Sequence, residues 1–214
     1  MFINKHMPVF HEHKLIFYHI GKTGGMSICS ALGFNPKDYT VYLPEYVHGV
    51  NRNVMTQHAR PRYVSLCINT QADNDYYKFT IVRNPWDRLV SCYYYLYNIH
   101  TQRHGDFTTW LNKFVYNHVK SKRYLEGDHL TPQLEYTHDQ QNQQIVNYIG
   151  RYETLQQSFD HVCIENNIPR SELTVKNYSG KRRGIKYREC YTPADADLVY
   201  ELYAPEIEQY GYAF

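Results

Sequence analysis

The sequence lacks the hydrophobic segments that anchor a protein in a membrane or direct it out of the cell. No stretch of its 214 residues approaches the roughly 18 consecutive apolar residues of a membrane-spanning helix. Residues 1–14 are of mixed polarity and contain no apolar core of a signal peptide. We therefore expect a cytoplasmic protein with no integral membrane segment, which leaves peripheral association with a membrane open.

Cysteine is scarce, and its pattern argues against a disulfide framework. The five cysteines are an odd number and include no Cys-X-X-Cys pair. Each lies within or beside an apolar pattern, so we expect reduced, mostly buried thiols. The five are Cys29, Cys67, Cys92, Cys163 and Cys190.

The chain also has little net charge, +2 with histidine neutral. A nucleic-acid-binding protein usually shows a dominant basic field, so we expect no nucleic-acid partner. The basic residues are nevertheless unevenly placed, because lysine and arginine crowd into residues 176–188.

Predicted strands alternate with predicted helices, which is typical of an α/β fold with a parallel sheet, here in one domain spanning 1–214. Apolar runs predict strands at 14–20, 77–82 and 144–152. Apolar residues at helical spacing predict helices at 26–32, from 85 to about 99, from 106 or 108 to about 120, at 154–167 and from 193 onward. Weaker signals are a strand or hairpin arm at 39–47, a helix at 60–70 and a polar surface excursion at 121–144.

The first functional motif is a glycine-rich turn directly after the first strand. Gly24 and Gly25 expose backbone N–H groups, Lys22 adds a mobile charge, and Thr23 and Ser27 add hydroxyls. These groups suit an anion such as phosphate, although a plain tight turn would also use the two glycines.

This turn is not the P-loop of a nucleotide triphosphatase. That motif, GxxxxGK[ST], would need glycine at position 16, which is Ile16. The strand that would supply an acidic magnesium ligand ends in Arg83 instead. The turn therefore suits one phosphate, and no metal is expected.

A second anion site is predicted where the strand at 77–82 ends. Arg83 follows that strand, and Ser91 lies on the helix that Pro85 begins. A guanidinium and a helix hydroxyl so placed can converge on one anion. The alternative is that Arg83 pairs with Asp87. Arg88 is interpreted as structural support.

The stretches HIGKTGGMSI and FTIVRNPWDRLVSCYYYL resemble the two nucleotide motifs of sulfotransferases that use PAPS (3′-phosphoadenylyl sulfate). The resemblance is closest to the carbohydrate branch that includes heparan sulfate 2-O-sulfotransferase and its bacterial relatives. It covers nearly the whole chain, since IGRYETLQQSF, KNYSGKRRGIKYRECYT and YELYAPEIEQYGYAF also resemble family segments. It implies a three-layer, P-loop-like α/β fold with a central parallel sheet.

The resemblance also implies roles for the residues of both motifs. Arg83 and Ser91 would clamp the 3′-phosphate. The 5′-phosphosulfate would bind the first turn, at Lys22, Thr23, Gly24, Gly25, Met26 and Ser27. Met26 stands where a threonine is usual, which removes one hydroxyl contact. The basic segment would fold over the 3′ end through Asn177, Ser179, Lys181, Arg182 and Arg183, unless these side chains form a solvated face.

In such an enzyme the sulfuryl group of PAPS moves in line to an acceptor hydroxyl and leaves 3′,5′-ADP. The reaction needs a cation at the departing oxygen, a role that suits Lys22, and a base for the acceptor proton. Among 12 histidines, His58 resembles the catalytic histidine of the family. Glu135 is a weaker candidate, and His129 and His138 are expected to touch the acceptor. The acceptor is expected to be a glycan.

Two other functions fit parts of the pattern. A P-loop kinase for a small molecule would share the glycine turn, but the absence of glycine at position 16 argues against it. A non-catalytic glycan- or nucleotide-binding relative would keep Arg83 and Ser91 without turnover, and Met26 favours it. The oligomeric state has no signal in the sequence.

Overall fold

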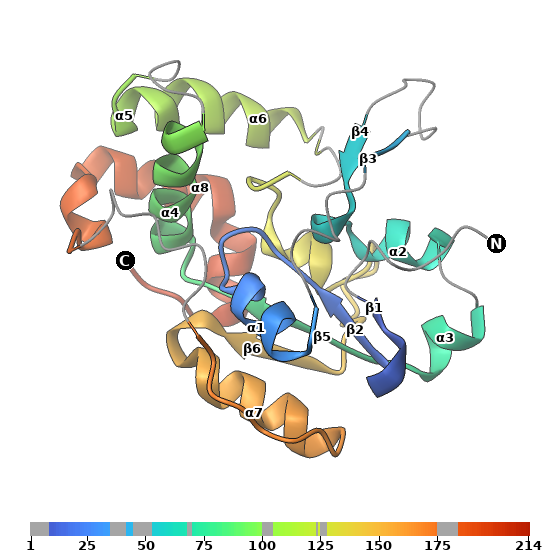
Figure 1. Ribbon diagram of the computed structural model, residues 1–214. Coiled ribbons are helices and arrows are strands. Elements are labelled where there is room, and N and C mark those ends of the chain that lie inside the picture. The colour runs from blue at the N-terminus through green and yellow to red at the C-terminus, as the bar shows by residue number, and fades with distance from the viewer. Residues whose placement is uncertain are drawn as a thin grey trace.

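A four-stranded sheet, in the order β1-β2-β5-β6, forms the centre of the computed structural model (Figure 1). Its strands are β1 (Val9–Phe10), β2 (Leu15–Tyr18), β5 (Tyr77–Val82) and β6 (Tyr148–Arg151). With the helices around it, the sheet makes the protein α/β, as the sequence predicts. The structure describes residues 9–34, 42–44, 53–67, 70–99, 105–122, 124, 128–174 and 184–214.

The sheet is mixed, so the prediction of a parallel sheet holds for three strands and is wrong for β1. β2, β5 and β6 are parallel, whereas β1 pairs antiparallel with β2. Only the 3-10 turn His11–His13 and Lys14, which is left-handed at φ 52°, separate β1 from β2. A parallel pair needs a crossover of about a dozen residues or more, so this connection permits only an antiparallel pair.

One face of the sheet is covered by α1 (Gly25–Ala31) and α7 (Leu155–Glu165). Ile28 of α1 and Phe159 of α7 are buried in one hydrophobic cluster with Phe17 of β2. Both helices lie on the same side of the sheet in Figure 1. This packing places the turn between β2 and α1 at the carboxyl edge of the strands.

The opposite face is covered by different elements. Ile16 and Tyr18 alternate with Phe17 along β2 and therefore point to this side. They pack in a second cluster with α2 (Pro61–Cys67), the 3-10 helix Gln133–Tyr136 and the end of α8 (Pro193–Tyr210). The two faces are thus covered by helices from different parts of the chain.

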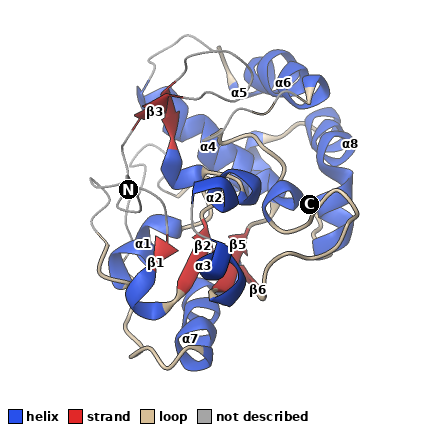
Figure 2. Ribbon diagram, turned by 90° about the vertical axis from the view of Figure 1, so that its right-hand side faces the viewer, coloured by secondary structure: helices blue, strands red, loops and turns tan. Residues whose placement is uncertain are grey.

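A third cluster joins helices beside the sheet, where Figures 1 and 2 show α4, α5, α6 and α8 gathered together. α4 (Pro85–Ile99) and α8 pack around Trp110, which is fully buried. The predicted helix up to about residue 120 is present as α5 (Phe107–Thr109), a π-helical segment Trp110–Val115 and α6 (Tyr116–Ser121). The sequence does not anticipate the π-helical segment.

The weaker sequence signals also correspond to elements. β3 (Tyr42–Pro44) and β4 (Asn53–Met55) form an antiparallel pair, which confirms the strand expected within 39–47. α2 confirms the helix expected at 60–70. The other elements of the described ranges are α3 (Thr70–Asp75) and 3-10 helices at Thr56–His58, Tyr152–Thr154 and Tyr187–Cys190.

Polar side chains cap the starts of three helices. The Asn84 side chain accepts a hydrogen bond from the backbone N–H of Trp86 (3.1 Å) at the start of α4. Asp106 caps α5 through its side chain. Thr192 and Asp195 form the capping box of α8. Such caps satisfy N–H groups that have no partner within the helix, so each fixes where its helix begins.

The segment predicted as a polar surface excursion, 121–144, is partly buried, and that prediction is wrong for its middle. Leu130, Thr131 and Gln133 are 2%, 0% and 0% exposed. Their backbone finds polar partners inside the protein, because Arg88 donates to the Thr131 oxygen (2.6 Å) and the Gln133 N–H donates to the Glu206 carboxylate. A polar segment can be buried when its backbone groups find hydrogen-bond partners.

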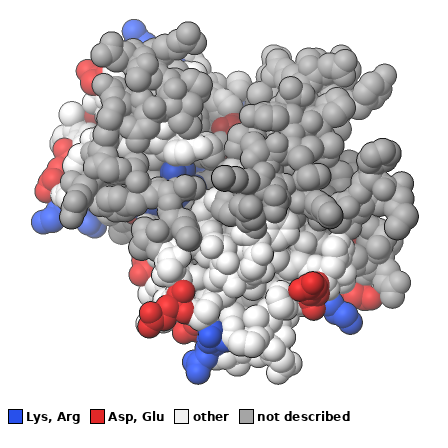
Figure 3. All heavy atoms as spheres, viewed as in Figure 1, with Lys and Arg blue, Asp and Glu red and all other residues white. Residues whose placement is uncertain are grey.

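The cysteines follow the expectation where their side chains are described. Cys29, Cys92 and Cys163 are buried, and Cys190 is half-buried. Cys67 lies in α2, but its side chain is outside the described residues. None of the described helices is long and apolar enough to cross a membrane. On the face shown in Figure 3, the coloured acidic and basic side chains are interspersed.

Candidate functional site

The glycine turn connects β2 to α1 and is packed against histidine rings. A Cβ atom on Gly21 would overlap the His129 ring, and one on Gly25 would overlap the His19 ring. No side chain larger than hydrogen fits at either position while these rings stay in place. The glycines therefore let two histidines approach the backbone of the turn.

Lys22 lies at the tip of this turn in a left-handed conformation (φ 69°). Its ammonium group lies 3.9 Å from the centre of the Tyr95 ring of α4, and its backbone oxygen accepts from Nη1 of Arg83 (2.8 Å). A ring face attracts a cation, so Tyr95 holds the lysine charge at the edge of the sheet. The half-buried lysine therefore lies in the first predicted anion motif, the glycine turn, and contacts Arg83 and Tyr95 of the second.

The other residues of the turn differ in their burial. Thr23 is fully buried, and its hydroxyl donates to the Ile20 oxygen (2.8 Å), which closes the turn. Ser27 is buried at 6% exposure, and Met26 is half-buried at the start of α1. Gly24 precedes α1 as its N-cap with φ 83°.

Arg83 pairs with Asp87, so the ion pair considered as the alternative from the sequence is present. Nε and Nη2 of Arg83 lie 2.8 and 2.7 Å from Oδ2 of Asp87. The guanidinium carbon also lies 3.8 Å from the centre of the Tyr152 ring. Arg83 is 4% exposed, and it joins the glycine turn to α4. Ser91 is half-buried further along α4.

Five of the predicted nucleotide-binding residues belong to the basic segment at 176–188. Asn177, Ser179, Lys181, Arg182 and Arg183 lie outside the described residues.

His58 lies against the turn and is 3% exposed. Its Nδ1 lies 2.7 Å from the backbone oxygen of His19. A carbonyl oxygen can only accept, so Nδ1 carries the proton and Nε2 of the neutral ring has a lone pair. Gln57 Nε2 and His129 Nε2 lie 2.9 and 3.3 Å from this nitrogen and donate to it in that tautomer. His58 is therefore oriented as a base.

Burial keeps the histidines at this site neutral. It lowers the pKa of His58 to about 4, against the opposing effect of the His19 carbonyl, and the charges of Lys22 and Arg88 lower it further. Burial also lowers the pKa of His19 and of His129 well below the usual histidine value. Within the described ranges, no three His, Cys, Asp or Glu side chains form a group that could hold a metal ion.

Arg88 holds the segments around the base together, in agreement with the structural role expected for it. The buried guanidinium donates to the backbone oxygens of Gly21 (3.3 Å) and His129 (2.8 Å). It lies 3.8 Å from the carboxylate of Glu206, which is 1% exposed. Glu206 in turn accepts from the Gln133 side chain (2.8 Å). Arg88 therefore holds the glycine turn and the backbone of His129 in fixed positions relative to each other.

Several of these residues were not found by sequence reasoning. Glu206 had a usable signal, because it shares a buried helix face with Tyr203, Ile207 and Tyr210. The contact of His129 with His58 had none, since 71 positions separate the two residues. Glu135, the weaker base candidate, instead pairs with Arg60 at 3.4 Å.

The sequence matches the model of the Sulfotransferase family over residues 5–213. No curated protein and no solved structure matches the chain at a significant level. Because the family match spans nearly the whole chain, the protein belongs to the sulfotransferase family, whose enzymes transfer sulfuryl groups.

Proposed function

We propose that this protein transfers the sulfuryl group of PAPS to a hydroxyl of a carbohydrate, with His58 as the base and without a metal. The observation that carries the proposal is the fixed tautomer of His58, which directs a lone pair from Nε2 beside the glycine turn. Lys22 lies on that turn, so a base and a cation are close to the proposed anion site. Family membership supports sulfuryl transfer in general.

The nucleotide would bind across both motifs. The 5′-phosphosulfate would occupy the turn formed by Lys22, Thr23, Gly24, Gly25, Met26 and Ser27, and the 3′-phosphate would bind Arg83 and Ser91. The bond from Arg83 to the Lys22 oxygen supports this, because it joins the two motifs (2.8 Å). In this proposal the phosphate takes the place of the Asp87 carboxylate beside Arg83. Asn177, Ser179, Lys181, Arg182 and Arg183 complete the proposed set of nucleotide-binding residues.

In the reaction, Nε2 of His58 would take the proton of the attacking hydroxyl while Lys22 stabilises the oxygen that leaves the sulfur. Gln57 and His129 donate to the same nitrogen and would have to yield to the acceptor. The anionic nucleotide would offset the charges of Lys22 and Arg88, which lower the pKa of His58. Binding of PAPS would therefore make His58 a stronger base.

Thermal unfolding tests the nucleotide assignment. We expect 3′,5′-ADP to raise the melting temperature far more than ATP with magnesium, because a ligand stabilises the folded state according to its affinity. Equal or reversed shifts would reject the assignment and favour the kinase alternative. A protein that binds 3′,5′-ADP but transfers no labelled sulfuryl group to any polysaccharide would be the non-catalytic relative instead. The three-layer, P-loop-like arrangement is part of this proposal, supported by helices on both faces of the sheet.

A further inference from the structure

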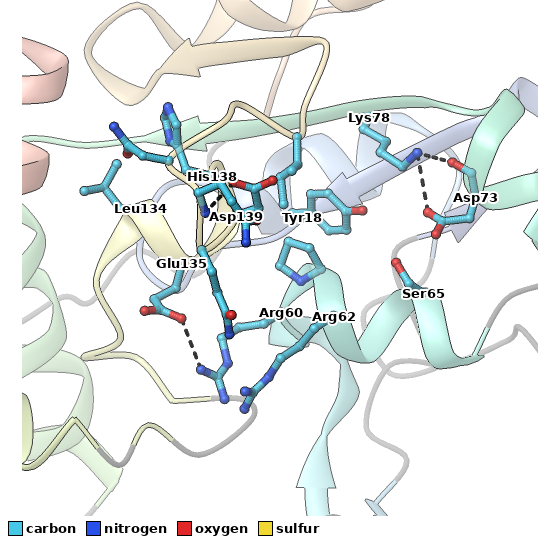
Figure 4. A pocket seen from close by; sticks show the side chains of 15 residues that line it. Tyr18, Arg60, Arg62, Ser65, Asp73, Lys78, Leu134, Glu135, His138 and Asp139 are labelled. Carbon is cyan, nitrogen blue, oxygen red and sulfur yellow. Dashed lines mark hydrogen bonds and ion pairs between the residues drawn. The ribbon is translucent and has the colours of Figure 1, made fainter.

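A pocket of about 850 Å³ lies on the α2 side of the sheet, apart from the glycine turn. Its walls come from β2, α2, α3, β5 and the loop at 138–145 (Figure 4). None of the residues proposed to bind the nucleotide lines it. We call it the α2 pocket.

Tyr18 provides the sign that this pocket takes a ligand. The residue is 1% exposed, and among the described residues its hydroxyl has no hydrogen-bond partner. In Figure 4 its ring projects into the pocket toward Ser65 and Asp73. Burial, and then the Asp73 carboxylate, raise the pKa of Tyr18, so the hydroxyl keeps its proton and can donate it. The hydroxyl is not one of the buried polar atoms that lack a partner, so it faces the open space of the pocket, where a ligand oxygen can accept its hydrogen bond.

Acidic and basic side chains alternate in the wall, and two pairs of them are in contact. Arg60 lies 3.4 Å from Glu135, and Lys78 lies 3.4 Å from Asp73. Asp139 accepts from two backbone N–H groups of its own loop. A wall of balanced donors and acceptors suits a ligand that both donates and accepts hydrogen bonds, which is the property of hydroxyl groups.

The α2 pocket adjoins the base through three segments of chain. Tyr18 precedes His19, whose backbone oxygen accepts from His58. Arg60 follows His58 by two residues. Glu135 precedes the tyrosine whose hydroxyl donates to the backbone oxygen of His58 (3.0 Å). The wall of the α2 pocket is therefore continuous with the backbone segments that hold the base.

We propose that the α2 pocket binds a sugar unit of the acceptor, adjacent to the unit whose hydroxyl His58 deprotonates. Tyr18 donates to an oxygen of that sugar, and the exposed amides of Gln140 and Gln141 bind other hydroxyls. This inference rests on the proposed function, since it assigns the sugar to the acceptor of the same reaction.

An NMR titration of the full chain with two hexasaccharides, neutral maltohexaose and acidic chondroitin hexasaccharide, tests the inference without turnover. Tyr18→Phe and Gln141→Ala should each weaken binding by about three- to tenfold, as expected for one hydrogen bond. Tyr200→Phe and Gln209→Ala, which alter exposed groups on α8, should leave it unchanged. Maltohexaose binding should persist at an ionic strength of about 0.5 M, because it depends on hydrogen bonds rather than on charge.

The exposed Gln141 keeps the test decisive if Tyr18→Phe fails to fold. Absence of binding to both hexasaccharides, or equal binding by Gln141→Ala and the unaltered protein, would overturn the inference. Sulfuryl transfer is measured separately from PAPS labelled in the sulfuryl group. Binding without transfer would contradict the proposed function and leave the sugar site standing.

Discussion

Nδ1 of His58 lies 2.7 Å from the backbone oxygen of His19, and the two imidazole rings meet edge to face with centres 4.4 Å apart. The base is therefore positioned by the backbone that leads into the glycine turn. A change in that turn should move the base and the proposed 5′ site together.

The buried histidines should make the protein sensitive to mild acid. The pKa of His58 is about 4 in the folded protein and near 6.5 in the unfolded chain, so the unfolded state binds more protons between these values. The stabilisation is fully present above pH 6.5 and is lost as the pH falls toward 4, by at most about 1.4 kcal/mol per pH unit for each such histidine. His58→Gln should reduce this dependence in melting curves recorded from pH 7 to about 4. An unchanged slope would contradict the burial of a neutral His58.

Gly25→Ala should displace His58 indirectly, through the His19 residue that holds it. The new methyl group would overlap the His19 ring, which also stacks on Phe17 (centres 5.3 Å apart) and is 3% exposed. Overpacking of this kind lowers the free energy of unfolding by about 1–3 kcal/mol. Denaturant unfolding measures the loss, and NMR of the His58 ring should show a shifted signal.

Gly33→Ala is the matched control for that variant. Gly33 has φ 78°, and a Cβ there would meet nothing within 4 Å. The free energy of unfolding of Gly33→Ala should fall by roughly 1–2 kcal/mol, because only backbone strain is added. The NMR signal of His58 should not shift. Equal effects of both variants on His58 would refute the proposed packing of His19 on the turn.

Arg83→Ala separates a phosphate clamp from a purely structural ion pair. If Arg83 binds the 3′-phosphate, the variant should bind 3′,5′-ADP more weakly by roughly 1.5–3 kcal/mol, as expected for a charged hydrogen bond. Affinity for 5′-AMP should change little, because it lacks that phosphate. Calorimetric titration with both nucleotides gives the comparison. Equal losses for the two would show that Arg83 only joins Lys22 and Asp87.

The elements that sequence reasoning located are those fixed by local signals. The strand at 77–82 and the starts of α4 and α8 follow from apolar runs and capping residues that act within a few positions. The antiparallel β1 was missed because its strand has only two residues. The break in α8 was missed although Pro205 lies inside the helix, two residues after the non-helical Tyr203 (φ −121°, ψ 17°).

The sequence located only the part of the site that is formed by local motifs, because contacts between distant segments leave no local signal. The glycine turn and Arg83 are visible as motifs, and the structure joins them through the Lys22 oxygen. The burial of 129–137 was not predictable, because its partners Arg88 and Glu206 come from two other helices. Polar segments carry no mark of burial when distant side chains satisfy them.

The most direct measurement is sulfuryl transfer from labelled PAPS to a polysaccharide acceptor by the unaltered protein and by His58→Asn. The asparagine amide can still donate to the His19 oxygen, so 3′,5′-ADP affinity should be nearly intact. Turnover should fall by about 10²–10⁴-fold, the usual contribution of a general base. Unchanged turnover in His58→Asn, with the nucleotide bound normally, would contradict the assignment of His58 as the base.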